Sequence, residues 1–251
     1  MADSAAEIDT LDPFVEYSYS YGPAVVQENT IGKTVAEVRA KIAPLRFMLA
    51  ARNISQELEL SEGQKVLELG SGLGLLGQAI KKEIGGKLEY SGIELAYKSA
   101  KKSKEKGLFG IQADSTNLPF ADNSFEALVS TDVLEHIPDS DRAVEEIKRV
   151  LKPGGKAFLV IADPSEARFG YVHDHIDRSK KGSDIKYWED VFADKGLNVL
   201  TENSNKYRSK DWRKIFNLPF LVKLKDKPGF ACAFNPVNRP GTYVVQKPKT
   251  E

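Results

Sequence analysis

The sequence is poor in cysteine, and this bounds its covalent chemistry. Cys232 is the single cysteine among 251 residues, so no disulfide can form within the chain. A cytoplasmic location is therefore the simplest expectation. The apolar neighbours of Cys232, from Phe230 to Phe234, favour a buried packing role over a reactive thiol.

An excess of either charge is also missing. Lysine and arginine number 36, and aspartate and glutamate also number 36. Dedicated DNA or RNA binders usually carry a basic excess, so the balance disfavours a nucleic-acid partner. No apolar run approaches the ~20 residues that a membrane-spanning helix needs, and the N-terminus does not have the pattern of a signal peptide. The length fits one large domain or one domain with appendages, as a monomer or a homodimer.

A short apolar run that meets a cluster of glycines is the most informative stretch present. Lys65–Leu69 is predicted to be a buried strand, since it is apolar and too short for a helix. The turn Gly70–Gly74 allows positive φ and close approach of a ligand, and a helix follows from Leu75. Strand, glycine turn and helix form the first unit of a nucleotide-binding α/β sheet, with the ligand at the carboxyl end of the strand.

The rest of the chain extends this alternation of strands and helices. It predicts an α/β fold with a doubly wound, mostly parallel sheet covered by helices on both faces. A helix capped by Asp139 should place Glu145, Glu146, Lys148 and Arg149 on its solvent face, and a sharp turn should follow it. Further strands are expected at Lys87–Glu94, Phe109–Asp114, Phe125–Thr131, Lys156–Ala162, Leu197–Thr201 and Gly241–Gln246, further helices at Tyr97–Lys106 and Lys186–Lys195, and the turn at Lys152–Gly155.

The two ends of the chain carry no comparable motif. Residues 1–60 are interpreted as an N-terminal arm and helical cap, and residues 61–251 as the sheet domain, with substrate-side elements in 164–240. Tyr17, Tyr19 and Tyr21 alternate, which is typical of an extended segment. Such a segment is either an arm packed on the domain or a lid over the ligand.

The glycines fit two nucleotide cofactors. Gly72-x-Gly74-x-x-Gly77 matches the dinucleotide fingerprint, with Glu94 at about the ~20-residue distance of a ribose-binding acid. The alternative register, Gly70-x-Gly72-x-Gly74, begins directly after the strand. The glycines alone leave this choice open.

Acids at three successive strand ends decide between the cofactors. Glu68 lies one residue before the end of its strand, where a carboxylate would repel a pyrophosphate and favour a cationic group. Glu94 can accept hydrogen bonds from ribose hydroxyls, and Asp114 from an adenine amino group. S-adenosylmethionine carries an ammonium and a sulfonium and no phosphate, so it fits these acids better than a dinucleotide. The alternative for Glu68 is a side chain that points to solvent or pairs with a lysine.

The central part of the chain, from about residue 62 to 163, resembles the class I S-adenosylmethionine-dependent methyltransferases. The resemblance is to the small-molecule type that includes ubiquinone/menaquinone- and sterol-methylating enzymes. It implies a Rossmann-like sheet of seven strands, the last of them antiparallel. The matching stretches are VLELGSGLG (66–74), SGIE (91–94), IQADSTNLPFADNSFEALVSTDVLEHIPD (111–139) and EEIKRVLKPGGKAFLV (145–160).

The resemblance also implies roles for individual residues. The turn would hold the methionine part of the cofactor, through Gly70, Ser71, Gly72 and Gly74. Glu94 would bind the ribose and Leu95 would lie against the adenine. The remaining cofactor contacts would be made by Asp114 and Ser115 at the adenine edge, and by Thr131 and Asp132 beneath the sulfonium. The product would be S-adenosylhomocysteine.

Methyl transfer requires alignment of the acceptor with the methyl group, and a general base where the acceptor must lose a proton. His136, His173 and His175 are the three candidates for this base. We expect no metal, because oxygen ligands dominate magnesium sites, although His173, Asp174 and His175 could supply a ligand set. Candidates for the substrate wall are Tyr17, Tyr19, Tyr21, Arg168 and Trp212.

Three other functions stay open on the sequence. One is a nicotinamide-dependent oxidoreductase using the dinucleotide register, and another is a protein that kept the cofactor fold without activity. The third is a protein or RNA methyltransferase. Amino-group methylators of that kind carry Asn/Asp-Pro-Pro-aromatic after the fourth strand, where this chain has Thr131–Leu134. The aromatic content of the two ends predicts a small, apolar or ring-bearing acceptor, methylated on O, C or an activated N.

Overall fold

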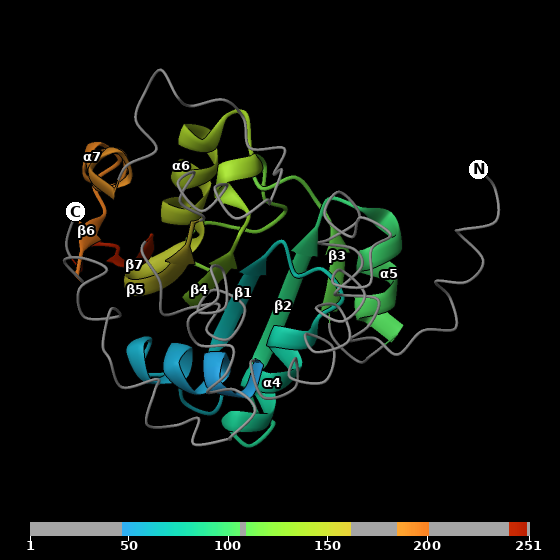
Figure 1. Ribbon diagram of the computed structural model, residues 1–251. Helices are drawn as coiled ribbons and strands as arrows, with labels where there is room; N and C mark the ends of the chain where they lie inside the picture. The colour runs from blue at the N-terminus through green and yellow to red at the C-terminus, as the bar shows by residue number, and fades with distance from the viewer. Residues whose placement is uncertain (1–46, 106–108, 162–184, 201–240, 250–251) are drawn as a thin grey trace, which may run out of the picture.

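The computed structural model describes residues 47–105, 109–161, 185–200 and 241–249 of the chain. Within them lies one seven-stranded sheet of order β3-β2-β1-β4-β5-β7-β6 (Figure 1). Strands β1 to β5 are parallel, and β7 runs antiparallel to both of its neighbours. The predicted fold class is confirmed. The strands are β1 (Lys65–Leu69), β2 (Glu89–Glu94), β3 (Phe109–Gln112), β4 (Phe125–Thr131), β5 (Leu151–Val160), β6 (Asn198–Val199) and β7 (Thr242–Gln246).

The helices follow the predicted positions closely. Asp139 caps α6 as expected, because its Oδ1 accepts a hydrogen bond from the backbone N of Arg142 at 3.0 Å. None of the described helices is long and apolar enough to cross a membrane. The helices are residues 47–57, α4 (Leu75–Glu83), α5 (Tyr97–Glu105), the short 3-10 helix η2 (Leu134–His136), α6 (Ser140–Val150) and α7 (Ile185–Asp194).

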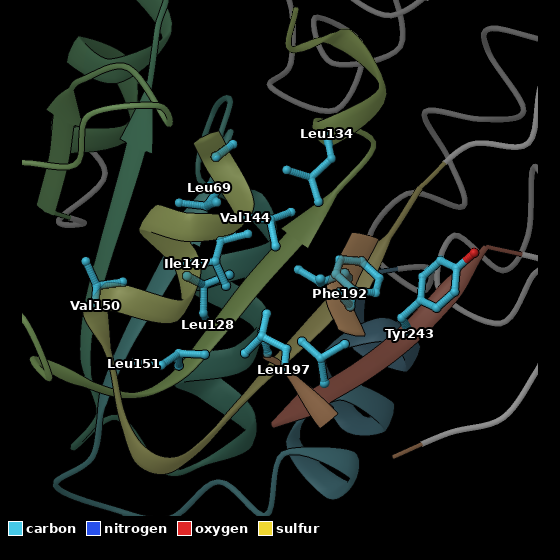
Figure 2. Close-up of a cluster of buried hydrophobic side chains, with 14 of the residues drawn as sticks. Leu69, Leu128, Leu134, Val144, Ile147, Val150, Leu151, Phe192, Leu197 and Tyr243 are labelled. Atoms are coloured by element: carbon cyan, nitrogen blue, oxygen red, sulfur yellow. The ribbon is translucent and has the colours of Figure 1, made fainter. Parts of the chain in front are cut away.

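Alternation along β1 divides the core between the two faces of the sheet. Leu67 and Leu69 point to one face, where they pack with residues of α6 and α7; Figure 2 shows this cluster, with Ile147 and Phe192 among its members. Val66 points to the other face, where it packs with α4 and with helix 47–57. Because both faces are covered, β1 is buried from Val66 to Leu69 and β4 from Ala127 to Ser130.

Helix 47–57 belongs to the cap predicted for residues 1–60. Its buried residues share one cluster with β1 and α4. The domain boundary between residues 60 and 61 stays a prediction. Most of the arm, the cap before residue 47 and most of the substrate-side segment 164–240 lie outside the described residues.

The solvent face predicted for α6 is wrong at Glu146. Its side chain is 2% exposed and accepts hydrogen bonds from the backbone N of Leu118 and from Arg149. Arg149 also donates to the carbonyl oxygens of Leu118 and Phe120. The loop between β3 and β4 folds over this part of α6 and needs a carboxylate and a guanidinium to satisfy its backbone. The hydrogen bond from Arg149 lowers the pKa of Glu146, so this buried carboxyl is ionised.

The turn predicted at Lys152–Gly155 is a bulge inside β5. The pair Phe125 and Leu151 is followed by the pair Ala127 and Lys156, so β5 advances five residues while β4 advances two. Such an excess kinks the strand. The strand therefore begins at Leu151, earlier than the sequence predicts.

Replacement of Arg149 by alanine should destabilise the protein by about 3 kcal/mol, because it removes the closer of the two cations at the buried carboxylate of Glu146, 2.7 Å away. Arg142→Ala is the matched control: this arginine also contacts Glu146 but is half exposed, so its loss should cost about 0.5 kcal/mol. Urea denaturation measures both. Equal losses for the two variants would contradict the structural role given to Arg149.

Candidate active site

The carboxyl end of β1 runs into a turn of three glycines with φ values of 65° at Gly70, 51° at Gly72 and 75° at Gly74. All three lie in the left-handed region that favours glycine. A Cβ on Gly70 would lie 2.3 Å from Cγ2 of Val133, whereas a Cβ on Gly72 would meet nothing within 4 Å. Packing therefore excludes a side chain at Gly70, and Gly72 faces open space.

The carboxylate of Glu94 ties this turn to the end of β2. Its Oε2 accepts a hydrogen bond from the backbone N of Gly72, and its Oε1 accepts one from the backbone N of Ala96, both at 3.0 Å. Each carboxylate oxygen keeps a second lone pair for a ligand. Leu95 follows with a side chain that is 70% exposed, which is unusual for leucine and gives the turn an apolar neighbour.

The end of β3 lies beside these residues. The side chain of Gln112 donates to the carbonyl oxygen of Leu95, and the backbone N of Ala113 donates to that of Glu94, both at 3.2 Å. Asp114 comes two residues after the strand ends, and its Oδ1 accepts from the backbone N of Thr116 at 2.8 Å. Asp114 is exposed and Ser115 half-buried. The structure thus brings the predicted turn, Glu94, Leu95 and Asp114 together along one edge.

β4 contributes the opposite side of this edge. Thr131 ends the strand, and Asp132 follows with a φ of 57°, a left-handed conformation that is uncommon outside glycine. The backbone N of Asp132 donates to the carbonyl oxygen of Val160, which fixes this conformation. His136 is exposed on η2, three residues after the glycine-contacting Val133.

Glu68 lies in neither of the two alternative surroundings considered from the sequence, which were solvent and contact with a lysine. Its side chain is 4% exposed, and its Oε2 accepts a hydrogen bond from the hydroxyl of Tyr90 at 2.9 Å. Burial raises the pKa of Glu68 to about 8, against the smaller opposing effect of the Tyr90 hydrogen bond. Tyr90 was not predicted as a site residue. The spacing along β2 could have indicated Tyr90. Gly92 pairs with Glu68, and Tyr90 lies two positions before Gly92, so both positions share one face of the strand.

Several predicted residues fall outside the described part of the chain. Within that part, no three His, Cys, Asp or Glu side chains are grouped as a metal site, and the expectation of no metal stays a prediction. The residues outside are the base candidates His173 and His175 and the wall candidates Tyr17, Tyr19, Tyr21, Arg168 and Trp212.

Residues 67–159, from β1 to β5, match the family model described as "Methyltransferase domain". This region of the chain is therefore similar to methyltransferase domains. The match spans the glycine turn, both acids at the ends of β2 and β3, and η2, which are the elements that form the candidate site. The family resemblance inferred from the sequence is confirmed.

The relatives that this region matches are named as methyltransferases. The chain is 31% identical over 121 residues to the ubiquinone/menaquinone biosynthesis C-methyltransferase UbiE of Idiomarina loihiensis, covering 45% of this chain and 48% of that protein. It is 37% identical over 116 residues to the sterol 4-C-methyltransferase strm-1 of Caenorhabditis elegans, covering 43% and 34%. The matches thus span half or less of each relative.

A solved structure extends the likeness of fold beyond the matched region. The (4+2)-cyclase SpnF superposes with a TM-score of 0.53 at 18% identity, covering 80% of each chain. At this identity the likeness concerns the fold alone. The name of SpnF also illustrates that one fold can serve different reactions.

S-adenosylmethionine fits the residues at this edge. Gly72 offers open space where a side chain would otherwise stand, and the hydroxyl of Ser71 is buried with no hydrogen-bond partner among the described residues. Leu95 offers an exposed apolar surface for a base, and the nearby acids suit a ligand with cationic rather than phosphate groups. The family implies the same cofactor.

Replacement of Gly72 by alanine should weaken binding of S-adenosylhomocysteine at least tenfold, because the methyl group would enter the open space at the turn. The left-handed φ adds a stability cost of about 1–2 kcal/mol. Gly63→Ala is the matched control: its φ is 81° and its Cβ also meets nothing within 4 Å, but it lies before β1. Calorimetric titration and urea denaturation separate the two effects. Equal affinity loss in both variants would contradict a ligand at Gly72.

Replacement of Glu68 by glutamine should flatten the pH dependence of stability. The pKa of Glu68 is raised from 4.5 to about 8 on folding, so the folded protein keeps a proton that the unfolded chain releases. The stabilisation from this group is therefore complete below about pH 4.5 and is lost as pH rises toward 8. Urea denaturation between about pH 5 and about pH 9 should show a steeper decline for the wild type than for Glu68→Gln. Parallel curves would contradict the raised pKa.

Proposed function

We propose that the protein is an S-adenosylmethionine-dependent methyltransferase that acts on a small, apolar or ring-bearing metabolite. The observation that carries the proposal is the hydrogen-bonded edge formed by the glycine turn, Glu94 and the end of β3. Within this edge a single ligand could contact Gly72, Leu95 and Asp114. The match of residues 67–159 to the methyltransferase domain family supports the same activity.

The proposed cofactor contacts follow the edge from β1 to β4. Ser71 and the backbone of Gly70, Gly72 and Gly74 would hold the methionine part, with the carboxyl of Glu68 as a partner for its ammonium. Glu94 would accept hydrogen bonds from the ribose, since each of its oxygens has a lone pair left. The base would be bound by Leu95, Asp114 and Ser115, and the floor beneath the sulfonium would be formed by Thr131 and Asp132.

When bound, the cofactor supplies an electrophilic methyl group on a good leaving group. The chain then has to orient the acceptor in line with that methyl and exclude water. The strained backbone at Asp132, fixed by its hydrogen bond to Val160, would hold the β4 side of the site rigid. His136 is exposed on η2 beside this edge and could take a proton from an acceptor hydroxyl or carbon.

The acceptor class rests on the relatives and on the composition of the chain ends. UbiE and strm-1 are named for quinone biosynthesis and sterols, which are largely apolar. The segments 1–60 and 164–240 contain Tyr17, Tyr19, Tyr21 and Trp212, which could line an apolar wall, and Arg168, which could bind a polar substituent. We place the acceptor beside these segments. A neutral net charge disfavours RNA as the acceptor. The single cysteine is the observation behind the proposed cytoplasmic location.

The matches reported above give the nicotinamide alternative no support, and a direct test is available. The purified protein is titrated with S-adenosylhomocysteine and, separately, with NAD. It is then incubated with methyl-labelled cofactor and a panel of quinone precursors, phenols and sterols. We expect S-adenosylhomocysteine to bind and a small product to carry the label. Binding of NAD alone, or label found only in protein or RNA, would overturn the proposal.

Asp114→Ala should weaken S-adenosylhomocysteine binding about tenfold, because one hydrogen bond to a charged acceptor is lost. Glu89→Ala is the matched control, since this exposed glutamate begins β2 at the opposite edge of the sheet. Calorimetric titration of both variants should show an affinity loss for Asp114 alone. Unchanged affinity in Asp114→Ala would remove Asp114 from the cofactor site.

The candidate bases are distinguished by rate rather than by affinity. Separate alanine variants of His136, His173 and His175 should show a loss of kcat of about 10²–10⁴ for the acting base with unchanged cofactor affinity. If all three keep the full rate on the identified acceptor, transfer proceeds by alignment alone.

A further inference from the structure

Glu68 and Tyr90 form a buried polar pair beneath the glycine turn. Tyr90 is 1% exposed and Glu68 4% exposed, and the Tyr90 hydroxyl lies 2.9 Å from Oε2 of Glu68. Burial and the neighbouring Glu68 raise the pKa of Tyr90 well above its usual value, so the phenol keeps its proton and is the donor. This is the one hydrogen bond that the described residues give to the carboxyl of Glu68.

The surrounding packing fixes the ring of Tyr90. Gly77 of α4 faces it so closely that a Cβ there would lie 2.5 Å from Cε1 of Tyr90. Tyr90 also packs in the cluster that includes Val66 and Ile80. Because an interior at crystal-like density leaves little freedom to a buried ring, the hydroxyl position is set by α4 and β1 together.

The charges around the pair favour a neutral carboxyl. In the part of the chain that the structure describes, two titratable groups act on Glu68, namely Tyr90 and Glu94, and the negative charge of Glu94 raises the pKa of Glu68 further. A buried carboxylate with a like charge as its neighbour is costly. In the free protein, burial and this like charge therefore favour the protonated form of Glu68, at the position in β1 that leads directly into the turn.

We propose that Tyr90 is a positioning residue that holds Glu68 to receive the ammonium group of the cofactor, so that cofactor binding expels the proton of Glu68 to water. The inference rests on the proposed function, because it requires a ligand with an ammonium at the turn. An ammonium supplies an opposite charge that no described residue supplies to Glu68, and an opposite charge within hydrogen-bonding distance favours the ionised carboxyl. The Tyr90 hydroxyl stabilises that same ionised form, since it donates to it.

The test compares wild type, Tyr90→Phe, Glu68→Gln and the double variant in calorimetric titrations with S-adenosylhomocysteine. The range of about pH 6 to about pH 7 lies below the titration of an α-amino group. In that range wild-type affinity should rise nearly tenfold per pH unit, because the ligand must displace a proton. Glu68→Gln should show almost no dependence on pH. Buffers of different ionisation enthalpy should report release of nearly one proton by the wild type and none by Glu68→Gln.

Tyr90→Phe removes only the hydroxyl and should weaken binding about tenfold at each pH while keeping the steep slope. In the Glu68→Gln background the same change should have little effect, because its action is through the ionised carboxyl. An equal loss in both backgrounds would show a merely structural role for Tyr90 and overturn the proposal.

If Tyr90→Phe does not fold, a measurement on the wild type still tests the release of a proton from Glu68. Infrared difference spectra recorded on addition of S-adenosylhomocysteine should show the loss of a protonated carboxyl band that is missing in Glu68→Gln. A band that persists, or affinity that is independent of pH, contradicts this inference and leaves the proposed function intact. Absence of S-adenosylhomocysteine binding at every pH contradicts both.

Discussion

The parallel pairing of β1 with β2 on one side and β4 on the other is the constraint on which the site depends. Pairing of Glu68 with Gly92 and of Leu69 with Ile93 brings the glycine turn level with the end of β2. Glu94 can then accept a hydrogen bond from Gly72. A shift of the register by one residue would turn Leu69 from the cluster shown in Figure 2 to the opposite face, so the core and the site enforce the same alignment.

Two buried glutamates show how surroundings decide the state of one residue type. Glu146 is 2% exposed, but the hydrogen bond from Arg149 lowers its pKa, so it serves as a fixed anion for the β3–β4 loop. Glu68 is 4% exposed with Tyr90 as its donor, and burial raises its pKa. Glu146 therefore has its cation, Arg149, within the fold. No cation of the described residues contacts Glu68, and its position below the glycine turn suits a cation supplied by a ligand.

Sequence reasoning predicted most of the sheet because its signals are local. The apolar runs at β1 and β4, the glycines between them and the cap at Asp139 each depend on a few adjacent residues. It failed where a distant segment changes the environment. Helical periodicity predicts that Glu146 faces solvent, whereas in the structure the loop that carries Leu118 buries it. Likewise, the sequence of Lys152–Gly155 is typical of a turn, and only the pairing of β5 with β4 shows that these residues form a bulge.

The sequence by itself determined the order of the elements and the similarity to methyltransferase domains, and it predicted the residues along the proposed cofactor edge. These follow from local patterns, such as VLELGSGLG at 66–74, that depend little on the rest of the chain. Only the tertiary structure decided which acids are ionised. Burial, hydrogen-bond donors and neighbouring charges set a carboxyl's pKa. For Glu68 burial has the largest effect, the donor is Tyr90 and the neighbouring charge is Glu94, and these two residues are 22 and 26 positions away in the chain. The close approach of Gly77 to Tyr90 likewise exists only once α4 packs on the sheet.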